Sequence, residues 1–212
     1  MSVVVLISGR GSNLQALLDA GLPVSAVISN RSDAKGLEIA SARAIATRVI
    51  EHRTFPSREA FDAALADAID AFKPRLVVLA GFMRVLTPSF VVRFAGRLMN
   101  IHPSLLPGFP GLDTHARALA AGVKLHGCTV HFVTDELDHG PPVVQAAVPV
   151  YDDDTEGTLA ARVLEAEHRI YPAAVRWFLE GRLRVEGMRV IGGDLVREGA
   201  AVRAFCAPDP AR

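Results

Sequence analysis

A continuous run of aliphatic, mostly β-branched residues opens the chain at residues 3–7, and glycines follow it at positions 9 and 11. A run of this kind, without polar alternation, is typical of a parallel strand that is buried on both faces. Residues 12–18 then show a helical pattern, and we expect a capping residue in front of that helix. Strand, glycine turn and helix in this order predict the first unit of a parallel α/β sheet.

The same alternation of strand and helix continues through about residue 125. Apolar residues at helical spacing predict a helix over residues 58–72. We also expect strands at residues 24–29, 47–50, 76–80 and 98–102, an alanine-rich helix at 34–46 and a short helix after Pro88. The predicted fold class is therefore α/β, a Rossmann-like, open and mostly parallel sheet that is flanked by helices.

The pattern changes in the last third of the chain, where the sheet is expected to end in an antiparallel C-terminal β part. Two strands, at residues 127–134 and 143–150, are joined by a polar loop without a helix between them. Further along we expect a long helix at 155–179, short strands at 183–185 and 188–191, a turn at 192–193 and a frayed end at 207–212. We predict a single domain over residues 1–212, with a core of about residues 1–185 and a C-terminal extension at 186–212.

Charge and hydropathy exclude several classes of partner. Lys plus Arg and Asp plus Glu number 23 each, so the overall charge favours neither nucleic acid nor an anionic membrane surface. No apolar run approaches the roughly 18 residues of a membrane-spanning helix, and residues 1–7 are too short and uncharged for a signal peptide. Cys128 and Cys206 match no disulfide framework or zinc spacing. We therefore expect a cytoplasmic protein without nucleic-acid or membrane partners.

Asn100 and His102 stand two residues apart at the end of an apolar run, and Pro103 follows them. In a strand, two such residues point to the same face of the sheet. An asparagine amide can donate a hydrogen bond to a developing oxyanion, and a histidine can donate to it or move a proton. The pair therefore suits chemistry at a carbonyl carbon. The alternative is a strand end with a buried histidine whose hydrogen bonds are satisfied.

The glycine-containing segment of residues 8–13 predicts an anion site. Glycines between a strand and a helix allow backbone N–H groups to approach an oxyanion, and the helix N-terminus adds partial positive charge. The segment lacks the third glycine of a dinucleotide fingerprint and has no Gly-Lys-Ser/Thr, so neither NAD nor ATP is favoured. A single phosphate monoester fits better. The alternative is a tight turn that binds nothing.

Asp138 lies in the polar loop between the two late strands. If this loop folds over the strand end at residues 100–102, the carboxylate can face His102, favour the imidazolium or position a water that carries protons. The alternative is a solvated turn residue. The loop at residues 81–86, which follows a strand, either lines a slot for a flat heteroaromatic ligand or packs into the core.

Four histidines, His102, His115, His126 and His131, fall within about thirty residues, which raises a metal site as a competing reading. No His-x-x-x-His or Cys-x-x-Cys spacing accompanies them, so we expect no metal. His131 alternates with apolar neighbours in a predicted strand, and we expect it to point inward near the site.

Taken together, these segments resemble the glycinamide ribonucleotide formyltransferases, which are folate-dependent enzymes of purine synthesis. The resemblance covers residues 5–16, 78–86, 100–107, 130–138 and 167–172, in the order of the family. It implies a Rossmann-like sheet and transfer of the formyl group from 10-formyltetrahydrofolate, the co-substrate, to the amine of 5-phosphoribosylglycinamide (GAR). It implies no metal, and it leaves monomer and homodimer open.

The resemblance also assigns roles to individual residues. Asn100, His102 and Asp138 match the catalytic residues of the family. Gly11, Ser12 and Asn13 match the loop that holds the substrate phosphate, and Glu167 matches a carboxylate that contacts the substrate. The positions that match folate contacts are Arg58, Met83, Arg84, Val85, Leu86, Asn100, Thr134, Asp135, Glu136 and Leu137.

Three residues depart from the family pattern: Asp113 and Cys128 stand where histidine and threonine are common, and His139 stands where a second glycine is common. These departures put the pH dependence and the mobility of the loop at Asp138 in question more than the reaction.

Formyltetrahydrofolate hydrolases and methionyl-tRNA formyltransferases share the Asn-x-His and Asp pattern, but they carry additional domains for which 212 residues leave no room. A non-catalytic nucleotide-binding module remains a further alternative. It explains the sheet and the glycine loop, but not the combination of Asn100, His102 and Asp138.

Overall fold

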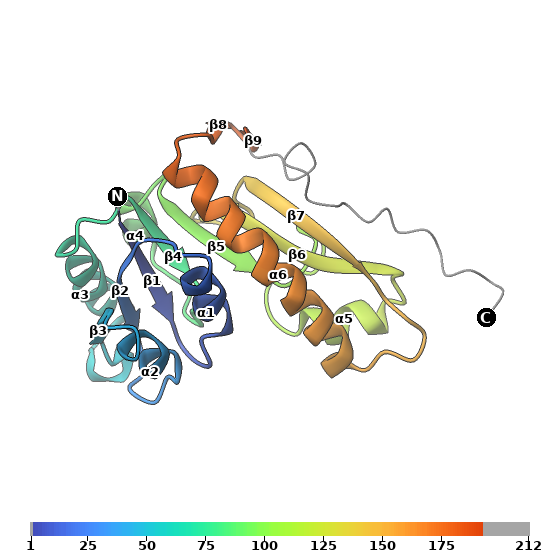
Figure 1. Cartoon of the computed structure of the whole chain (residues 1–212), viewed down its shortest axis with the longest axis horizontal. Coiled ribbons are helices and arrows are strands. Elements are labelled where there is room, and N and C mark those ends of the chain that lie inside the picture. Colours follow the sequence, from blue (N-terminus) through green and yellow to red (C-terminus); the bar gives the residue numbers. More distant parts are fainter. Residues whose placement is uncertain (1, 193–212) are drawn as a thin grey trace.

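The structure is a computed structural model that describes residues 2–192, so the predicted end of the C-terminal extension and Cys206 lie outside the described residues. Seven strands form one sheet in the order β3-β2-β1-β4-β5-β6-β7 (Figure 1). The strands are β1 (Val3–Ile7), β2 (Val24–Ser29), β3 (Ala46–Val49), β4 (Leu76–Leu79), β5 (Leu98–His102), β6 (Leu125–Phe132) and β7 (Pro142–Pro149). The helices are α1 (Ser12–Asp19), α2 (Gly36–Ser41), the 3₁₀ helix η1 (His52–Thr54), α3 (Arg58–Asp70), α4 (Pro88–Arg93), α5 (Thr114–Ala120) and α6 (Glu156–Leu179).

The sheet is mixed, and its strand directions confirm the predicted fold class. Strands β1 to β5 run parallel to one another. Strand β6 is antiparallel to β5, and β7 is antiparallel to β6. A separate hairpin of β8 (Arg184–Glu186) and β9 (Arg189–Ile191) follows α6.

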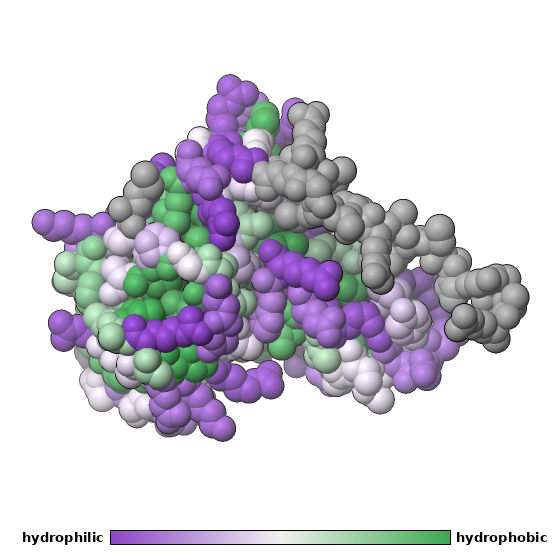
Figure 2. Space-filling model, in the orientation of Figure 1, coloured by the Kyte–Doolittle hydropathy of each residue, from purple (hydrophilic) through white to green (hydrophobic). Residues whose placement is uncertain are grey.

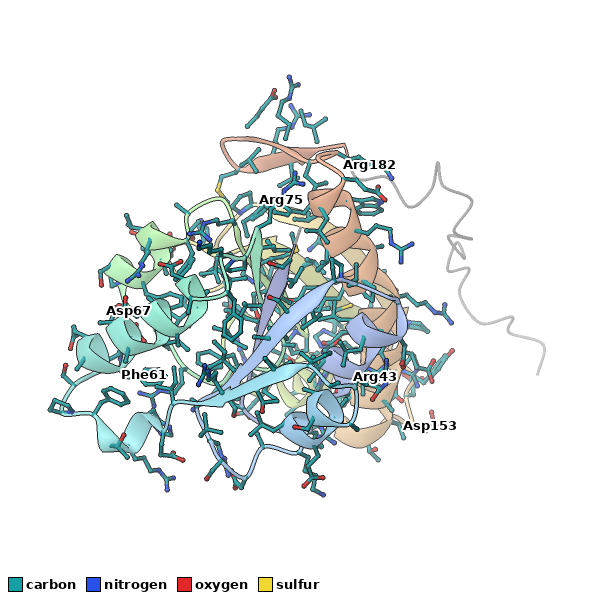
Figure 3. The ribbon with its side chains drawn as sticks, turned by 60° about the vertical axis from the view of Figure 1, so that its left-hand side comes forward. Arg43, Phe61, Asp67, Arg75, Asp153 and Arg182 are labelled. Atoms are coloured by element: carbon teal, nitrogen blue, oxygen red, sulfur yellow. The ribbon has the colours of Figure 1, made fainter. Side chains whose placement is uncertain are left out.

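Helices cover both faces of the sheet, which explains why the central strands are continuously apolar. Successive residues of β1 alternate between two cores: Val3, Val5 and Ile7 belong to one, and Val4 and Leu6 to the other. The first core packs against α1, α2, α5 and α6, and the second packs against α3 and α4 (Figure 1). Phe61 of α3 is 1% exposed and extends from its helix toward this second core (Figure 3).

The order of strands reverses next to β1, because the chain adds β2 and β3 on one side of it and β4 and β5 on the other. In open parallel sheets, ligands bind beyond the carboxyl ends of the strands at such a reversal. The loops that follow β1 and β4 meet at this point, where the Ser8 N–H donates to the Gly81 carbonyl over 3.1 Å. The topology therefore predicts a binding crevice at these two loops.

Two local expectations differ from the structure. The alanine-rich segment at 34–46 forms only the short helix α2, because the chain turns at Ala44, with φ 55°, and Ala46 already pairs with β2. Strand pairing thus overrides the helix propensity of alanine. The predicted residue in front of α1 supplies no side-chain cap: Gly11 holds that position. The β8–β9 hairpin turns at Gly187, with φ 60°, and the turn expected after it at 192–193 stays a prediction, because Gly193 lies outside the described residues.

Tyr171 of α6 joins this helix to the middle of the sheet. Its side chain is 0% exposed, and its hydroxyl lies 2.8 Å from the Leu79 carbonyl and 3.1 Å from the Met99 carbonyl. A single hydroxyl proton is shared between the two acceptors, one at the end of β4 and one in β5. The contact fixes α6 against the strand ends that border the crevice.

We expect the substitution Tyr171→Phe to lower the free energy of unfolding by about 1–2 kcal/mol, because two buried carbonyls lose a shared donor. Urea unfolding followed by circular dichroism measures the change. Tyr151→Phe is the matched control, since Tyr151 is 46% exposed and its change is expected to stay within about 0.5 kcal/mol. Equal losses in both variants would contradict the role given to the Tyr171 hydroxyl.

Candidate active site

The carboxyl end of β5 places Asn100 and His102 on one face of the sheet, as the sequence predicted. The antiparallel pairing with β6 sets His131 opposite Asn100 and Thr129 opposite His102. These two pairs bring four polar side chains together between β5 and β6. The patch is largely buried, since His102 is 6% exposed and His131 is 2% exposed. A polar cluster of this size at a strand end requires hydrogen-bond partners for every member.

His131 determines how the Asn100 amide is oriented. Burial lowers the pKa of His131, so the ring is neutral near pH 7. Its Nδ1 lies 2.9 Å from the Phe132 carbonyl, to which it can only donate. Nε2 is then an acceptor, and the Asn100 Nδ2 group donates to it over 3.2 Å. One N–H of the amide is used in this way, and the second remains available to a ligand.

Asp138 reaches the same cluster from the loop between β6 and β7. Its Oδ2 lies 3.4 Å from His102 Nδ1, and its Oδ1 lies 4.0 Å from His131 Nε2. The Gly111 N–H donates to Oδ2 over 2.8 Å, and the carboxylate is 8% exposed. The loop therefore folds over the strand end in the way that the sequence suggested, and it holds a buried carboxylate between two imidazoles.

His102 lies between two hydrogen-bond acceptors. Besides the Asp138 carboxylate at Nδ1, the Phe109 carbonyl lies 3.1 Å from Nε2. A ring that carries both protons donates to both acceptors, whereas a neutral ring satisfies only one of them. This arrangement orients the ring, with Nδ1 toward Asp138 and Nε2 toward the Phe109 carbonyl. It also means that His102 must exchange the Phe109 carbonyl for a substrate oxygen before it can donate to substrate.

The segment at residues 9–13 forms an open helix N-terminus after β1. Gly11 has φ 81°, and a Cβ on it would lie 2.6 Å from the Gly36 Cα, so only glycine fits without a shift. No side chain caps α1, and its first turn contains no acidic residue. The first N–H groups of the helix, from Ser12 onward, are thus free to bind an anion.

Glu167 of α6 lies directly beside this loop. Its Oε2 accepts a hydrogen bond from the Asn13 Nδ2 over 2.7 Å, and its side chain is 6% exposed. Burial raises the pKa of Glu167, and the Asn13 hydrogen bond opposes that shift. The structure therefore brings together Gly11, Ser12, Asn13 and Glu167, which the sequence assigned to one substrate.

Besides Asn100 of β5, the predicted folate-side residues lie on three separate elements. Met83 and Val85 are 65% and 53% exposed, and Leu137 is 59% exposed, so apolar side chains face solvent on two loops. Arg84, Leu86 and Thr134 are half-buried on these loops, and Asp135 and Glu136 are exposed. Arg58 is exposed at the start of α3, and no direct contact joins it to Asn100, His102 or Asp138.

The residues that depart from the family pattern lie around the site rather than in it. Asp113 precedes α5 with φ 56° and makes no side-chain cap. His139 is exposed, with Nδ1 3.8 Å from Glu136 Oε1. Cys128 is fully buried in β6, and burial raises the pKa of its thiol well above the ordinary value, so it is an unreactive core residue.

Behind His102, His115 and His126 form an edge-to-face ring pair with centroids 5.3 Å apart. Burial lowers the pKa of both, that of His126 to about 4, and the two ring nitrogens of His126 have no hydrogen-bond partner. Among residues 2–192, no group of three or more His, Cys, Asp and Glu side chains is arranged to hold a metal ion.

Two further polar residues, Ser8 and Tyr171, border the site and were not singled out from the sequence. Tyr171 follows Glu167 by one helical turn, a spacing that could have indicated a shared face. A hollow of about 620 Å³ between α1 and α6 reaches Ser12, but Asn100, His102 and Asp138 do not line it. Figure 2 shows hydrophilic residues scattered over the face that carries these two helices.

Comparison with known proteins identifies the family. Residues 1–175 match the formyl transferase family. The phosphoribosylglycinamide formyltransferase of Escherichia coli (strain K12) is 54% identical over 191 residues, 87% of this chain and 90% of that protein. The structure of glycinamide ribonucleotide transformylase 1 from Symbiobacterium toebii superposes with a TM-score of 0.89 at 50% identity, and covers 92% of this chain and 94% of its own. The phosphoribosylglycinamide formyltransferase of Coxiella burnetii gives 0.87 at 49% identity, with 91% and 93% covered.

The chain therefore belongs to the formyl transferase family, and within it to the phosphoribosylglycinamide formyltransferases.

The buried His126 predicts a loss of stability in mild acid. Its pKa is about 4 in the folded state against 6.5 in the unfolded chain, so the unfolded state binds more protons between these values. Its contribution is complete above pH 6.5, and on the order of 3 kcal/mol is lost as the pH falls toward 4. Urea unfolding from pH 7.5 to 4.5 should show a weaker pH dependence for His126→Phe than for wild type. Identical pH dependence in the two proteins would contradict this account.

Proposed function

We propose that Asn100, His102 and Asp138 catalyse formyl transfer from 10-formyltetrahydrofolate to the amine of GAR. As a phosphoribosylglycinamide formyltransferase, the chain is a transferase of purine biosynthesis. The observation that carries the proposal is the meeting of these three side chains at the carboxyl end of β5. They lie next to the crevice between the loops that follow β1 and β4, one for each substrate.

GAR binds through its phosphate at the start of α1. The N–H groups from Ser12 onward receive the phosphate, and Gly11 permits the close approach. Glu167, fixed by Asn13, contacts the bound nucleotide beside the loop.

The folate co-substrate occupies the other side of the crevice. The exposed apolar side chains of Met83, Val85 and Leu137 offer contacts for its flat ring system. Arg58, Arg84, Leu86, Thr134, Asp135 and Glu136 complete the proposed folate side. Asn100 counts among both the catalytic and the folate-side residues, because the amide N–H that is not donated to His131 is the one proposed to meet the formyl oxygen.

The reaction begins when the neutral amine of GAR attacks the formyl carbon. A new C–N bond forms, and the carbonyl oxygen becomes an oxyanion. The second N–H of Asn100 donates to this oxygen, and so does His102 through Nε2 once the Phe109 carbonyl has moved away. The Asp138 carboxylate, 3.4 Å from Nδ1, orients the His102 ring for this contact.

Collapse of the tetrahedral intermediate breaks the bond between the formyl carbon and N10 of the folate. The attacking nitrogen loses one proton and N10 gains one, so the exchange is balanced. Asp138 is the buried base nearest to the reacting atoms and organises this transfer, directly or through one water.

The other expectations for this function stay predictions. No helix among residues 2–192 is long and apolar enough to cross a membrane. We expect a cytoplasmic enzyme that needs no metal, binds neither nucleic acid nor membranes, and works as a monomer or homodimer.

One assay tests the function directly. Purified protein is incubated with 10-formyltetrahydrofolate and GAR, and the release of tetrahydrofolate is followed. We expect release only when GAR is present. Release without GAR would indicate a formyltetrahydrofolate hydrolase, and no release in either mixture would exclude both activities.

Asp138→Asn and His102→Ala should each lower kcat by about 10²–10³-fold, the cost of weakening one oxyanion donor. Equilibrium titration with 10-formyltetrahydrofolate should give a Kd close to that of wild type, because neither residue belongs to the apolar folate side. Asp153→Asn is the matched control: Asp153 is exposed in the loop before α6 (Figure 3), and its variant should turn over normally. Turnover like wild type in either site variant would refute the assignment.

A further inference from the structure

The loop at residues 83–86, which carries much of the proposed folate side, is held at both ends by side chains from other elements. At its start, the Met83 N–H donates to the Ser8 hydroxyl over 2.8 Å. After its end, the Thr87 N–H donates to Asp62 Oδ2 of α3 over 2.6 Å. Both acceptors are buried, Ser8 at 5% and Asp62 at 2% exposed. The backbone of the loop is therefore positioned from outside, while Met83 and Val85 face solvent.

Ser8 also begins the loop that leads to the phosphate site. It follows β1 directly and precedes Gly9, and its N–H donates to the Gly81 carbonyl over 3.1 Å. One residue thus holds the start of the folate loop by two hydrogen bonds, through its backbone and through its hydroxyl. Of these two links, only the buried hydroxyl connects Ser8 to Met83 directly.

The orientation of the Ser8 hydroxyl is itself fixed. Its proton is donated to Asn30 Oδ1 over 2.6 Å, and Asn30 is 2% exposed at the end of β2. With the proton directed at Asn30, a lone pair of the oxygen faces the Met83 N–H. The Asn30 side chain is held in turn by His52 of η1, with Nδ2 and Nδ1 3.2 Å apart. The hydroxyl is therefore a rigid acceptor rather than a rotating one.

We propose that Ser8 is a positioning residue that couples the two substrate loops, so that GAR at residues 11–13 and folate at residues 83–86 strengthen each other's binding. The proposal rests on the proposed function, which assigns one substrate to each loop. Because Ser8 joins the two loops, a ligand that restrains one loop also restrains the start of the other, and the second ligand then binds at a smaller cost in ordering. By linkage, the factor must be the same in both directions.

The test measures this factor without chemistry. Calorimetric titration gives the Kd of tetrahydrofolate with and without saturating GAR; because neither molecule carries a formyl group, no transfer occurs. We expect GAR to tighten tetrahydrofolate binding at least about fivefold in wild type. In Ser8→Ala the factor should fall below about twofold, and the reciprocal titration of GAR should give the same two values.

Ser29→Ala is the matched control. Ser29 is 0% exposed at the end of β2, and its hydroxyl donates to the Arg31 carbonyl at 2.8 Å and accepts from the Arg31 N–H at 3.1 Å. Both substitutions remove a buried hydroxyl with two hydrogen bonds, so both should lower the melting temperature. Only Ser8→Ala should lose the coupling. If Ser8→Ala does not fold, Ser8→Cys replaces it, because a thiol fills the site but donates and accepts weakly.

The outcomes separate the two claims. A wild-type factor of one would overturn the coupling, whereas a wild-type factor retained in Ser8→Ala, or an equal loss in Ser29→Ala, would overturn the role of Ser8 in it. If the wild-type protein transfers no formyl group, the proposed function fails instead. Formyl transfer by wild type together with unchanged coupling in Ser8→Ala would overturn the role of Ser8 alone.

Discussion

The parallel pairing of β4 with both β1 and β5 is the constraint on which the rest of the molecule depends. It brings the carboxyl ends of three strands to the same end of the sheet. The phosphate loop follows β1, the folate loop follows β4, and Asn100 and His102 lie at the end of β5. The hydroxyl of Tyr171 and the carboxylate of Glu167 then attach α6 to this same end. Groups that are distant in sequence become neighbours because three strands end together.

The change from parallel to antiparallel strands has a separate consequence. Because β6 returns directly beside β5, a histidine stands opposite Asn100 and a threonine opposite His102. The loop between β6 and β7 then folds back over the sheet, so that Asp138 Oδ2 lies 3.4 Å from His102 Nδ1. The antiparallel part of the fold therefore supplies the carboxylate of Asp138, whereas the parallel part supplies Asn100 and His102.

Much of the architecture and of the site could be predicted from the sequence. The apolar runs located the strands, and the spacing of Asn100 and His102 predicted a shared face. The network around Ser8 could not be predicted, since its partners Asn30 and Met83 are 22 and 75 positions away and no local pattern marks them. The same holds for the Phe109 carbonyl at His102, because a backbone atom leaves no trace in residue identity. Helix α2 was overestimated because propensity is local and strand pairing is not.

Three non-glycine residues around His102 adopt left-handed backbone conformations: Phe109, Asp113 and Asp138, with φ between 53° and 56°. Each such conformation costs on the order of 1 kcal/mol for a residue with a side chain. Glycine at these positions would relax the backbone, and at Asp138 it would also remove the carboxylate. Selection for thermal tolerance and selection for turnover therefore act in opposite directions on the same few loop residues, and an attempt to make this enzyme more heat-resistant should leave Asp138 as it is.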